Sequence, residues 1–367
     1  MAGPGAVVAD RGAIAAGQIV LMPKPDVPRR PVRLPRPPVL AGREELLARL
    51  HDLLTSGEQP PVVVLRGMGG VGKTSLAAGY AHQHLAELGV AWQVQAENPA
   101  LLAAGLAELA AQLGAVPGTG QHDPVASLHA VLAAYPERWL LVFDNAPGAA
   151  SVRRFLPPAG RGRVVITSQN QHWPGDQTLD VPVLGRETAA EFLTGRTGDR
   201  DEAAARELAG ELGGLPLALE QAAAYIAATG GTIAGYLGLY QRRSADLLAR
   251  GEPAGYIKTV ATTWDLAFKR LEQDTPAASG LLRLLAYFAP EPVPLRLLLR
   301  RQDPPPDIGT GTLAVLGTMS GDRLAIGDAI AALRRYSLVT ALEDGVVLVH
   351  RLVLAVTRQN TAGDAAV

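Results

Sequence analysis

The sequence predicts a parallel α/β domain with helices on both faces, followed by an all-α helical domain and a winged-helix domain. Three observations predict this order. Short apolar runs alternate with helical patterns between residues 40 and 185, which is typical of βαβ units. After Gly185 helical patterns follow one another without strands. Near the C-terminus, Asp344-Gly345 separates two apolar runs, and such a pair is a strong hairpin signal.

Composition limits the classes of protein that this chain can be. The 367 residues carry 34 Lys and Arg against 35 Asp and Glu, so the net charge is −1 and no global positive field attracts a polyanion. With 48% hydrophobic and 19% charged residues, the chain can bury a sizeable core. It has no cysteine, which excludes disulfides, thiolate nucleophiles and cysteine-ligated zinc and favours a reducing, cytoplasmic location. No apolar stretch approaches the roughly 18 residues that cross a bilayer, so we expect no membrane segment.

The Pro- and Arg-rich N-terminal residues 1–38 are predicted to be a tail and linker. Proline at this density favours extended chain. Alternatively, its arginines place this segment along an acidic groove of its own protein. The remaining predicted segments are a nucleotide-binding domain at 39–185, a helical domain at 186–257, a winged-helix domain at 258–360 and a tail at 361–367.

The first folded part contains five predicted strands and the helices between them. Residues 62–65 are apolar and bounded by Pro61 and a glycine cluster, as a buried strand requires. Helix 72–88 carries Leu76 and Tyr80 on one face. The other predicted strands are 90–96, 139–143, 164–167 and 178–183, and the other helices are 44–54, 101–113 and 125–134.

The second part is predicted to be helical up to a proline-rich break at 289–294. Its apolar residues recur at helical spacing, and glycines separate the segments. The predicted helices are 188–193, 200–212, 216–229, 233–248, 259–271 and 277–288. After the break, a helix at 329–335 and strands at 337–343 and 346–350 indicate a winged helix.

The sharpest motif is the run Gly-Met-Gly-Gly-Val-Gly-Lys-Thr at residues 67–74, which matches GxxxxGK[ST] between a predicted strand and a predicted helix. Its glycines let backbone N–H groups point at a phosphate, and the helix N-terminus favours the same anion. Lys73 is expected to reach the β- and γ-phosphates, and Thr74 to ligate Mg²⁺. The predicted phosphate-binding residues are Gly67, Gly69, Gly70, Val71, Gly72, Lys73, Thr74 and Ser75.

Asp144 is the expected acidic partner of this phosphate-binding loop. It ends the apolar run Leu-Leu-Val-Phe-Asp, where its carboxylate can reach Mg²⁺ directly or through water. Lys73 and Asp144 are therefore the predicted catalytic pair. Many ATPases place an acid at the next position to activate water, but here the residue is Asn145, which cannot accept a proton at neutral pH.

The chain resembles the NB-ARC subgroup of the STAND signalling ATPases over residues 40–360. This subgroup includes the apoptosome scaffold protein and plant NLR immune receptors. Gly42-Arg43-Glu44 resembles the entry motif, Gly214-Leu215-Pro216-Leu217-Ala218 matches the GLPLA motif, and Val349-His350-Arg351 occupies the place of the MHD motif. The resemblance implies that Arg43, Pro216 and His350 lie at the nucleotide. Without it, Pro216 is explained as a helix-starting proline and His350 as a solvated strand-end histidine.

Two departures from the family pattern bear on hydrolysis. The fourth sheet strand commonly ends in an arginine that senses the γ-phosphate, and here Gln169 stands in its place. The acid of the MHD motif is replaced by Arg351. Together with Asn145, these departures predict a slow ATPase.

The resemblance implies a signalling switch that ADP holds closed and that exchange for ATP, with Mg²⁺, opens for self-association. The segment Thr263-Trp264-Asp265-Leu266 is most like actinobacterial members, which usually carry tetratricopeptide repeats downstream, so protein partners are expected through repeats beyond Val367. The alternative is a DNA-binding regulator that uses the winged helix, although the near-neutral charge makes DNA an unexpected partner. A turnover enzyme is disfavoured because no acid is found beside Asp144.

Overall fold

The computed structural model describes most of the chain in a series of segments. These are residues 30–35, 40–56, 60–115, 123–170, 172–173, 177–249, 256–289, 291–299, 322–341, 345–350 and 353–358. The predicted tail at 361–367, most of the predicted N-terminal tail and Arg351 lie outside the described residues.

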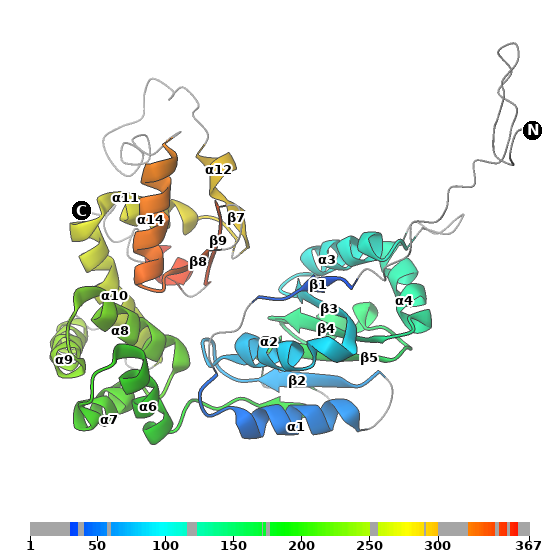
Figure 1. The fold of residues 1–367 in the computed structure, drawn as a ribbon, viewed down its shortest axis with the longest axis horizontal. Helices are drawn as coiled ribbons and strands as arrows, with labels where there is room; N and C mark the ends of the chain where they lie inside the picture. Colours follow the sequence, from blue (N-terminus) through cyan, green and yellow to red (C-terminus); the bar gives the residue numbers. More distant parts are fainter. Residues whose placement is uncertain are drawn as a thin grey trace, which may run out of the picture.

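A six-stranded parallel sheet forms the first half of the described chain (Figure 1). Its strand order is β1-β3-β4-β5-β2-β6, so β2 lies between β5 and β6. Because neighbouring strands pair in parallel, their carboxyl ends share one edge of the sheet, which is where α/β proteins bind ligands. The strands are β1 (Val32–Arg33), β2 (Val62–Arg66), β3 (Leu88–Gln95), β4 (Arg138–Asp144), β5 (Gly162–Ser168) and β6 (Thr178–Asp180).

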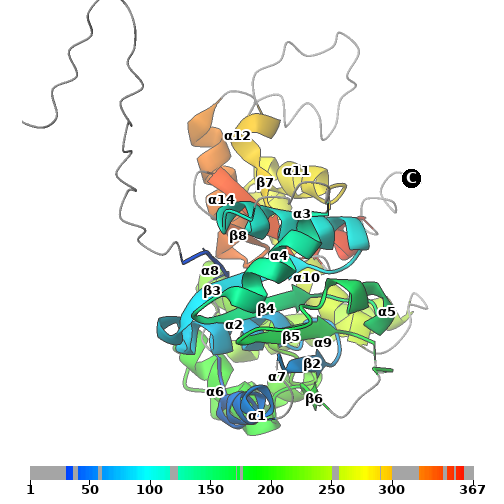
Figure 2. The ribbon, with the colours of Figure 1, turned by 90° about the vertical axis from the view of Figure 1, so that its right-hand side faces the viewer.

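Helices cover both faces of this sheet. The helices α1 (Glu44–Thr55) and α2 (Lys73–Gln83) pack on one face, and α3 (Pro99–Gln112) and α4 (Pro124–Ala134) pack on the other (Figure 2). Side chains alternate along β4: Leu140 faces α1 and α2, whereas Phe143 faces α3 and α4. This alternation explains why the strand is apolar throughout, since both of its faces are buried. The short helix α5 (Ala149–Val152) follows β4.

The described part of the predicted linker belongs to the sheet. Residues 32–33 form β1, which pairs in parallel with β3. Arg33 forms an ion pair with Glu108, and Arg30 lies 3.3 Å from the Glu137 carboxylate. Residues 30–35 thus contact the sheet domain through β1 and these two ion pairs, and the assignment of residues 1–38 as a tail and linker stays a prediction.

Two predicted elements have different limits in the structure. Helix α2 ends at Gln83 rather than at Leu88, because a 3₁₀ turn (Leu85–Glu87) follows and Leu88 begins β3. Leu88 pairs with Arg138 of β4, so its backbone belongs to the sheet and cannot continue the helix. Strand β6 covers only the first half of the predicted 178–183 segment, since the chain turns toward the helical region after Asp180.

Six helices follow the sheet: α6 (Arg186–Thr197), α7 (Glu202–Glu211), α8 (Pro216–Thr229), α9 (Ile233–Ala249), α10 (Tyr256–Asp274) and α11 (Pro276–Leu285). Asp201 caps α7 by accepting from the N–H of Ala204, and Pro216 occupies the first turn of α8, where its missing N–H has no cost. Figure 1 shows these helices grouped beside the sheet domain.

A three-stranded antiparallel sheet, in the order β7-β9-β8, completes the fold. The predicted hairpin is present as β8 (Val339–Ala341) and β9 (Val346–Val349), preceded by α14 (Arg323–Arg335). Strand β7 (Val293–Pro294) and helix α12 (Leu295–Leu298) lie where the sequence predicts only a break. Leu219 of α8, Leu333 of α14 and Val347 of β9 belong to one continuous hydrophobic cluster. The boundary at residue 257 and the winged-helix assignment stay predictions.

Within the described chain, no single helix is long and apolar enough to cross a membrane; only α8 taken together with residues 233–242 passes on length and composition, and that pair is bent by 115°.

Candidate functional site

The phosphate-binding loop connects β2 to α2 and depends on glycine at three positions. Gly67, Gly70 and Gly72 have φ angles of +150°, +73° and +94°, which L side chains rarely adopt. A Cβ on Gly67 would lie 2.6 Å from the carbonyl oxygen of Val181. Backbone geometry and close packing thus explain why the motif requires glycine there.

Lys73 is the first residue of α2 and is held inside the loop. Its side chain is buried, with the residue 6% exposed, and Nζ donates to the carbonyl oxygens of Gly67 (2.9 Å) and Met68 (2.7 Å). The loop thereby folds around an ammonium group at the N-terminus of an 11-residue helix. Both features favour an anion, because the positive charge and the first helical N–H groups act on the same space.

Asp144 lies at the carboxyl end of β4 and collects hydroxyl donors from two other elements. Thr74 of α2 donates to Oδ1 at 2.7 Å, and Thr167 of β5 donates to the same oxygen at 2.6 Å. Gln93 of β3 approaches Oδ2 at 3.4 Å. Asp144 is only 8% exposed, and these contacts fix the orientation of its carboxylate next to the start of α2.

These residues suit a magnesium ion that is shared with phosphate. Mg²⁺ prefers oxygen ligands and is usually held by one or two carboxylates together with substrate phosphates and waters. The Thr74 hydroxyl and the Asp144 carboxylate are such ligands, and among the described residues no cluster of three His, Cys, Asp or Glu forms a complete metal cage. The buried Oε1 of Gln93 has no hydrogen-bond partner in the described chain, so it remains an acceptor for a metal-bound water.

Arg43 joins the loop to the end of the sheet domain. One guanidinium nitrogen donates to the carbonyls of Val71 (3.2 Å) and Pro182 (2.8 Å). The residue is 5% exposed, and burial lowers the pKa of its guanidinium, which nevertheless remains charged. A cavity of about 300 Å³ opens beside it; the lining includes Gly42, Arg43, Leu46, Asp180, Val183, Leu184 and Thr188. The structure therefore places Arg43 against the backbone of the predicted nucleotide site.

Two further loop residues have the positions that the motif implies. Gly69 is buried within the loop, and Ser75 is half-buried as the third residue of α2. Val71 is 1% exposed and its side chain packs in the hydrophobic cluster beneath the loop. Val71 therefore contributes its backbone at the site, while its side chain stabilises the fold.

The Gly-Leu-Pro-Leu-Ala segment lies against the phosphate-binding loop. The backbone N–H of Leu217 donates to the carbonyl of Gly70 at 3.3 Å, which places the neighbouring Pro216 beside the loop. Gly214 has φ of +62°, and a Cβ there would lie 2.2 Å from the carbonyl oxygen of Leu184. The glycine of this motif is thus required for close approach of two backbones. A contact between Pro216 and a nucleotide stays a prediction.

His350 follows β9, and its side chain is exposed. Its carbonyl accepts from the N–H of Leu354, which begins a helical turn at 353–358. The predicted contact between His350 and a nucleotide stays a prediction.

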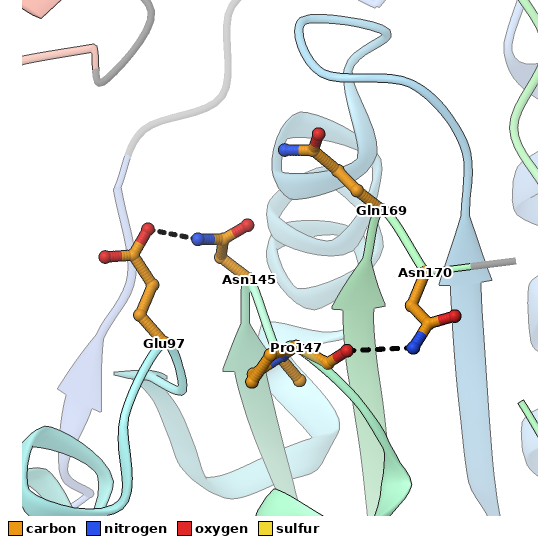
Figure 3. Close-up of a pocket in the computed structure, with 6 residues that line it drawn as sticks. Glu97, Asn145, Pro147, Gln169 and Asn170 are labelled. Atoms are coloured by element: carbon orange, nitrogen blue, oxygen red, sulfur yellow. Dashed lines mark hydrogen bonds between the residues drawn. The ribbon is translucent and has the colours of Figure 1, made fainter. Parts of the chain in front are cut away.

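A second cavity at the same sheet edge contains a residue that the sequence did not point to. Its volume is about 360 Å³, and Glu97, Asn145, Ala146, Pro147, Gln169 and Asn170 line it (Figure 3). The side-chain amide of Asn145 donates to the Glu97 carboxylate. The residue that follows Asp144 in the chain is not an acid, but Glu97, from just beyond the end of β3, brings a carboxylate into contact with the Asn145 side chain.

The pairing register between β3 and β4 is the signal that locates Glu97. Gln95 pairs with Asp144, so a residue just beyond Gln95 must lie near the residue just beyond Asp144. Gln169, which stands where the resembling proteins carry arginine, is exposed at the opposite side of the cavity, and its side chain is an uncharged amide (Figure 3).

Comparison with known proteins agrees with this site. Residues 39–193 match the AAA ATPase domain family. The chain is 25% identical to a nucleotide-binding leucine-rich repeat (NLR)-like protein of Hyaloscypha variabilis, over 86% of this chain and 34% of that protein. It is 31% identical to Regulatory protein AfsR of Streptomyces coelicolor, over 70% of this chain and 27% of that protein. The chain thus spans about a third of the length of these relatives.

A solved structure shares the fold. The STAND protein with a tetratricopeptide repeat sensor from Pyrococcus horikoshii matches with a TM-score of 0.55 at 17% identity, over 90% of this chain and 44% of that one. The parallel-sheet P-loop NTPase fold of the chain is therefore supported by structure, and the family match supports an ATPase domain over residues 39–193.

Proposed function

We propose that this chain is the nucleotide-operated switch of an NB-ARC-type STAND signalling protein, closed with ADP and opened by exchange for ATP. The observation that supports this most is the direct contact between the phosphate-binding loop and the helical region, where Leu217 donates to Gly70. A ligand bound in the phosphate-binding loop therefore lies next to the segment that contains Pro216. Phosphate binding and the position of the helices are therefore coupled through adjacent backbone.

Each residue of the sheet site has a chemical role in this proposal. Lys73 and the N-terminal N–H groups of α2 hold the β- and γ-phosphates. Thr74 and Asp144 hold Mg²⁺, which neutralises phosphate charge when it is bound. Arg43 fixes the loop from behind, since both of its carbonyl partners belong to the backbone around the site.

The switch itself follows from differential binding. A ligand shifts an equilibrium between two arrangements only by the difference in its affinity for them. We place ADP between the phosphate-binding loop, Pro216 and His350, so that the closed arrangement gains contacts from all three. The γ-phosphate of ATP adds charge and bulk on the side where Gln169 offers no cation, and this disfavours closure.

Assembly and partners extend the proposal to the longer protein. The solved STAND protein carries a tetratricopeptide repeat sensor, and the curated relatives are about three to four times the length of the matched region. We infer that the ATP-bound form self-associates in the cytoplasm and that repeats beyond this region receive the signal. Hydrolysis is slow and resets the switch rather than driving turnover.

Nucleotide binding and size measurements test the switch. Mass spectrometry of the purified chain should find bound ADP, and a fluorescent ADP analogue should bind the emptied chain. Light scattering after gel filtration should give a monomer with ADP and a larger species with a slowly hydrolysed ATP analogue and Mg²⁺. A chain that binds neither nucleotide, or whose size is the same with both, would contradict the proposal.

A DNA-binding regulator remains the second candidate because one relative is named a regulatory protein. The net charge of −1 gives no general attraction to DNA, so any binding must come from a local surface. A gel shift with genomic DNA fragments at low ionic strength distinguishes the two functions. Retarded DNA that responds to added ATP would favour the regulator.

A further inference from the structure

We propose that Glu97 is the general base that activates water for hydrolysis of the ATP γ-phosphate, and that Asn145 positions it. This inference rests on the proposed nucleotide site. Asn145 cannot accept a proton, and Glu97, which follows the neighbouring strand β3, supplies the proton acceptor instead.

The backbone places Glu97 at the reacting edge. Gln95 is the last residue of β3 and pairs with Asp144, and the N–H of Ala96 donates to the carbonyl of Asp144 at 2.7 Å. The chain is therefore still attached to β4 one residue before Glu97. Its half-buried carboxylate faces the residue that directly follows the proposed Mg²⁺ ligand (Figure 3).

A continuous set of hydrogen bonds connects Thr74 to Glu97. Thr74 and Thr167 both donate to Oδ1 of Asp144, and the Thr167 hydroxyl accepts from the backbone N–H of Asn145 at 2.8 Å. The Asn145 side chain then donates to Glu97. The position of the Glu97 carboxylate is thus fixed relative to the carboxylate of Asp144.

The backbone of Asn145 also indicates a positioning role. Its φ is +63°, a left-handed conformation that strains most side chains and that asparagine tolerates better than most. This conformation turns the side chain out of the strand direction and toward Glu97, as Figure 3 shows. The amide cannot accept a proton, so its role is to orient the carboxylate that can.

The cavity has the size and chemistry that an attacking water requires. Its volume of about 360 Å³ greatly exceeds that of one water molecule, and its lining combines a carboxylate with three side-chain amides. Of the described residues that line it, only Glu97 is ionisable; the others are Asn145, Ala146, Pro147, Gln169 and Asn170.

The proposed step balances as follows. The oxygen of water forms a bond to the γ-phosphorus, and the bond from that phosphorus to the β–γ bridging oxygen breaks with its electron pair going to ADP. The water proton moves to the Glu97 carboxylate and then to the departing phosphate or to solvent. The products are ADP and inorganic phosphate. Gln169 can donate a hydrogen bond to the same water or to the γ-phosphate, but it supplies no charge.

Single-turnover hydrolysis of ATP by the whole chain tests the assignment. A positioned general base contributes about 10²- to 10⁴-fold, so Glu97→Gln should slow phosphate release by about a hundredfold or more. Affinity for a fluorescent ATP analogue should stay within about threefold of wild type, because the base does not hold the ground-state nucleotide. Mass spectrometry after incubation should then find retained ATP on Glu97→Gln and ADP on the wild type.

Two further variants distinguish a catalytic role of Glu97 from a structural one. Glu97→Asp, which keeps the carboxylate, should recover part of the rate. The exposed Glu108 of α3 gives a matched control, since Glu108→Gln removes the same charge from a residue that does not line the cavity. Equal hydrolysis rates in wild type and Glu97→Gln would overturn the assignment of Glu97 as the base but not the proposed function. A wild type that binds no nucleotide would overturn the proposed function as well.

Discussion

The sheet edge and the junction with the helical region are built in different ways. At the sheet edge, side chains from four elements meet: Thr74, Gln93, Asp144 and Thr167 form a partly buried hydrogen-bonded group. At the junction, the Leu217 N–H donates to the Gly70 carbonyl, and Val183 packs against hydrophobic clusters of both regions. The polar groups of the site therefore lie within the sheet domain, whereas coupling to the helices depends on contacts between the two regions.

The hydrophobic clusters show the same division. Two clusters lie on the two faces of the parallel sheet, and a separate one joins α6 through β9. Because packed interiors resist small deformations, each unit keeps its internal geometry while the contacts between units change. Variants at the two regions should therefore affect different quantities: ligand affinity at the sheet edge and stability or coupling at the junction.

The largest effect is expected from Lys73→Ala at the sheet edge. Charge-assisted hydrogen bonds contribute about 1.5–3 kcal/mol each, so nucleotide affinity should fall by roughly a hundredfold or more. Titration calorimetry with ADP and Mg²⁺ measures the loss. Lys269→Ala is the matched control, because that lysine is exposed and pairs with Asp265 on its own helix. Equal affinity in Lys73→Ala and wild type would show that Lys73 does not hold the nucleotide phosphates.

A glycine pair tests the junction next. Gly213 and Gly214 have nearly the same φ, +61° and +62°, but a Cβ on Gly213 meets nothing within 4 Å whereas one on Gly214 would lie 2.2 Å from the Leu184 carbonyl. Alanine at Gly213 should cost about 1 kcal/mol of unfolding free energy for the left-handed backbone.

At Gly214 the same substitution should cost about 3 kcal/mol or more, because the overlap adds to the backbone strain. Urea unfolding of both variants gives the difference directly. If the two variants were equally stable, the close approach at the junction would not constrain the fold.

Arg43 connects the two regions, so Arg43→Ala should lower stability more than it lowers affinity. The substitution leaves the carbonyls of Val71 and Pro182 without their charged donor, at a cost of about 2 kcal/mol. Thermal unfolding checks the loss. Arg49→Ala alters an exposed arginine of the same cavity and should change stability by less than about 0.5 kcal/mol. A large loss of affinity with unchanged stability would make Arg43 a ligand contact instead.

The smallest effect is expected from Asp144→Asn, measured as dependence on Mg²⁺. The amide keeps the shape of the side chain and removes the charge, so ATP affinity in the presence of Mg²⁺ should fall by about tenfold. With a chelator present, the variant and the wild type should bind ATP within about threefold of each other, since no ion is then shared. A variant that retains the full Mg²⁺ response would show that the carboxylate does not hold the ion.

Much of this architecture is predictable because local and long-range signals agree. The apolar run of β4 indicates a strand buried on both faces, and the glycine loop before α2 predicts the phosphate site. Helix α8 begins at Pro216 and ends at Thr229, as its proline start and glycine stop indicate. In these segments periodicity, capping and turn chemistry favour the same structure.

The features that the sequence missed depend on pairing between distant segments. Strands β1 and β7 have two residues each, too few for any periodicity to appear. The position of Glu97 follows only from the register between β3 and β4. The requirement for Gly214 follows only from its approach to Leu184. Each of these features depends on residues that are close in space but distant in the sequence, so no local sequence pattern reveals it.

The short strand β1 also has a consequence for how copies of the protein can meet. It pairs with Ala91 and Trp92 of the eight-residue strand β3 and so occupies the middle of an edge that would otherwise offer its amides and carbonyls to another chain. The segment carries Arg30 and Arg33, which pair with Glu137 and Glu108. A short, charged edge strand of this kind disfavours the addition of a strand from a second copy over the paired residues.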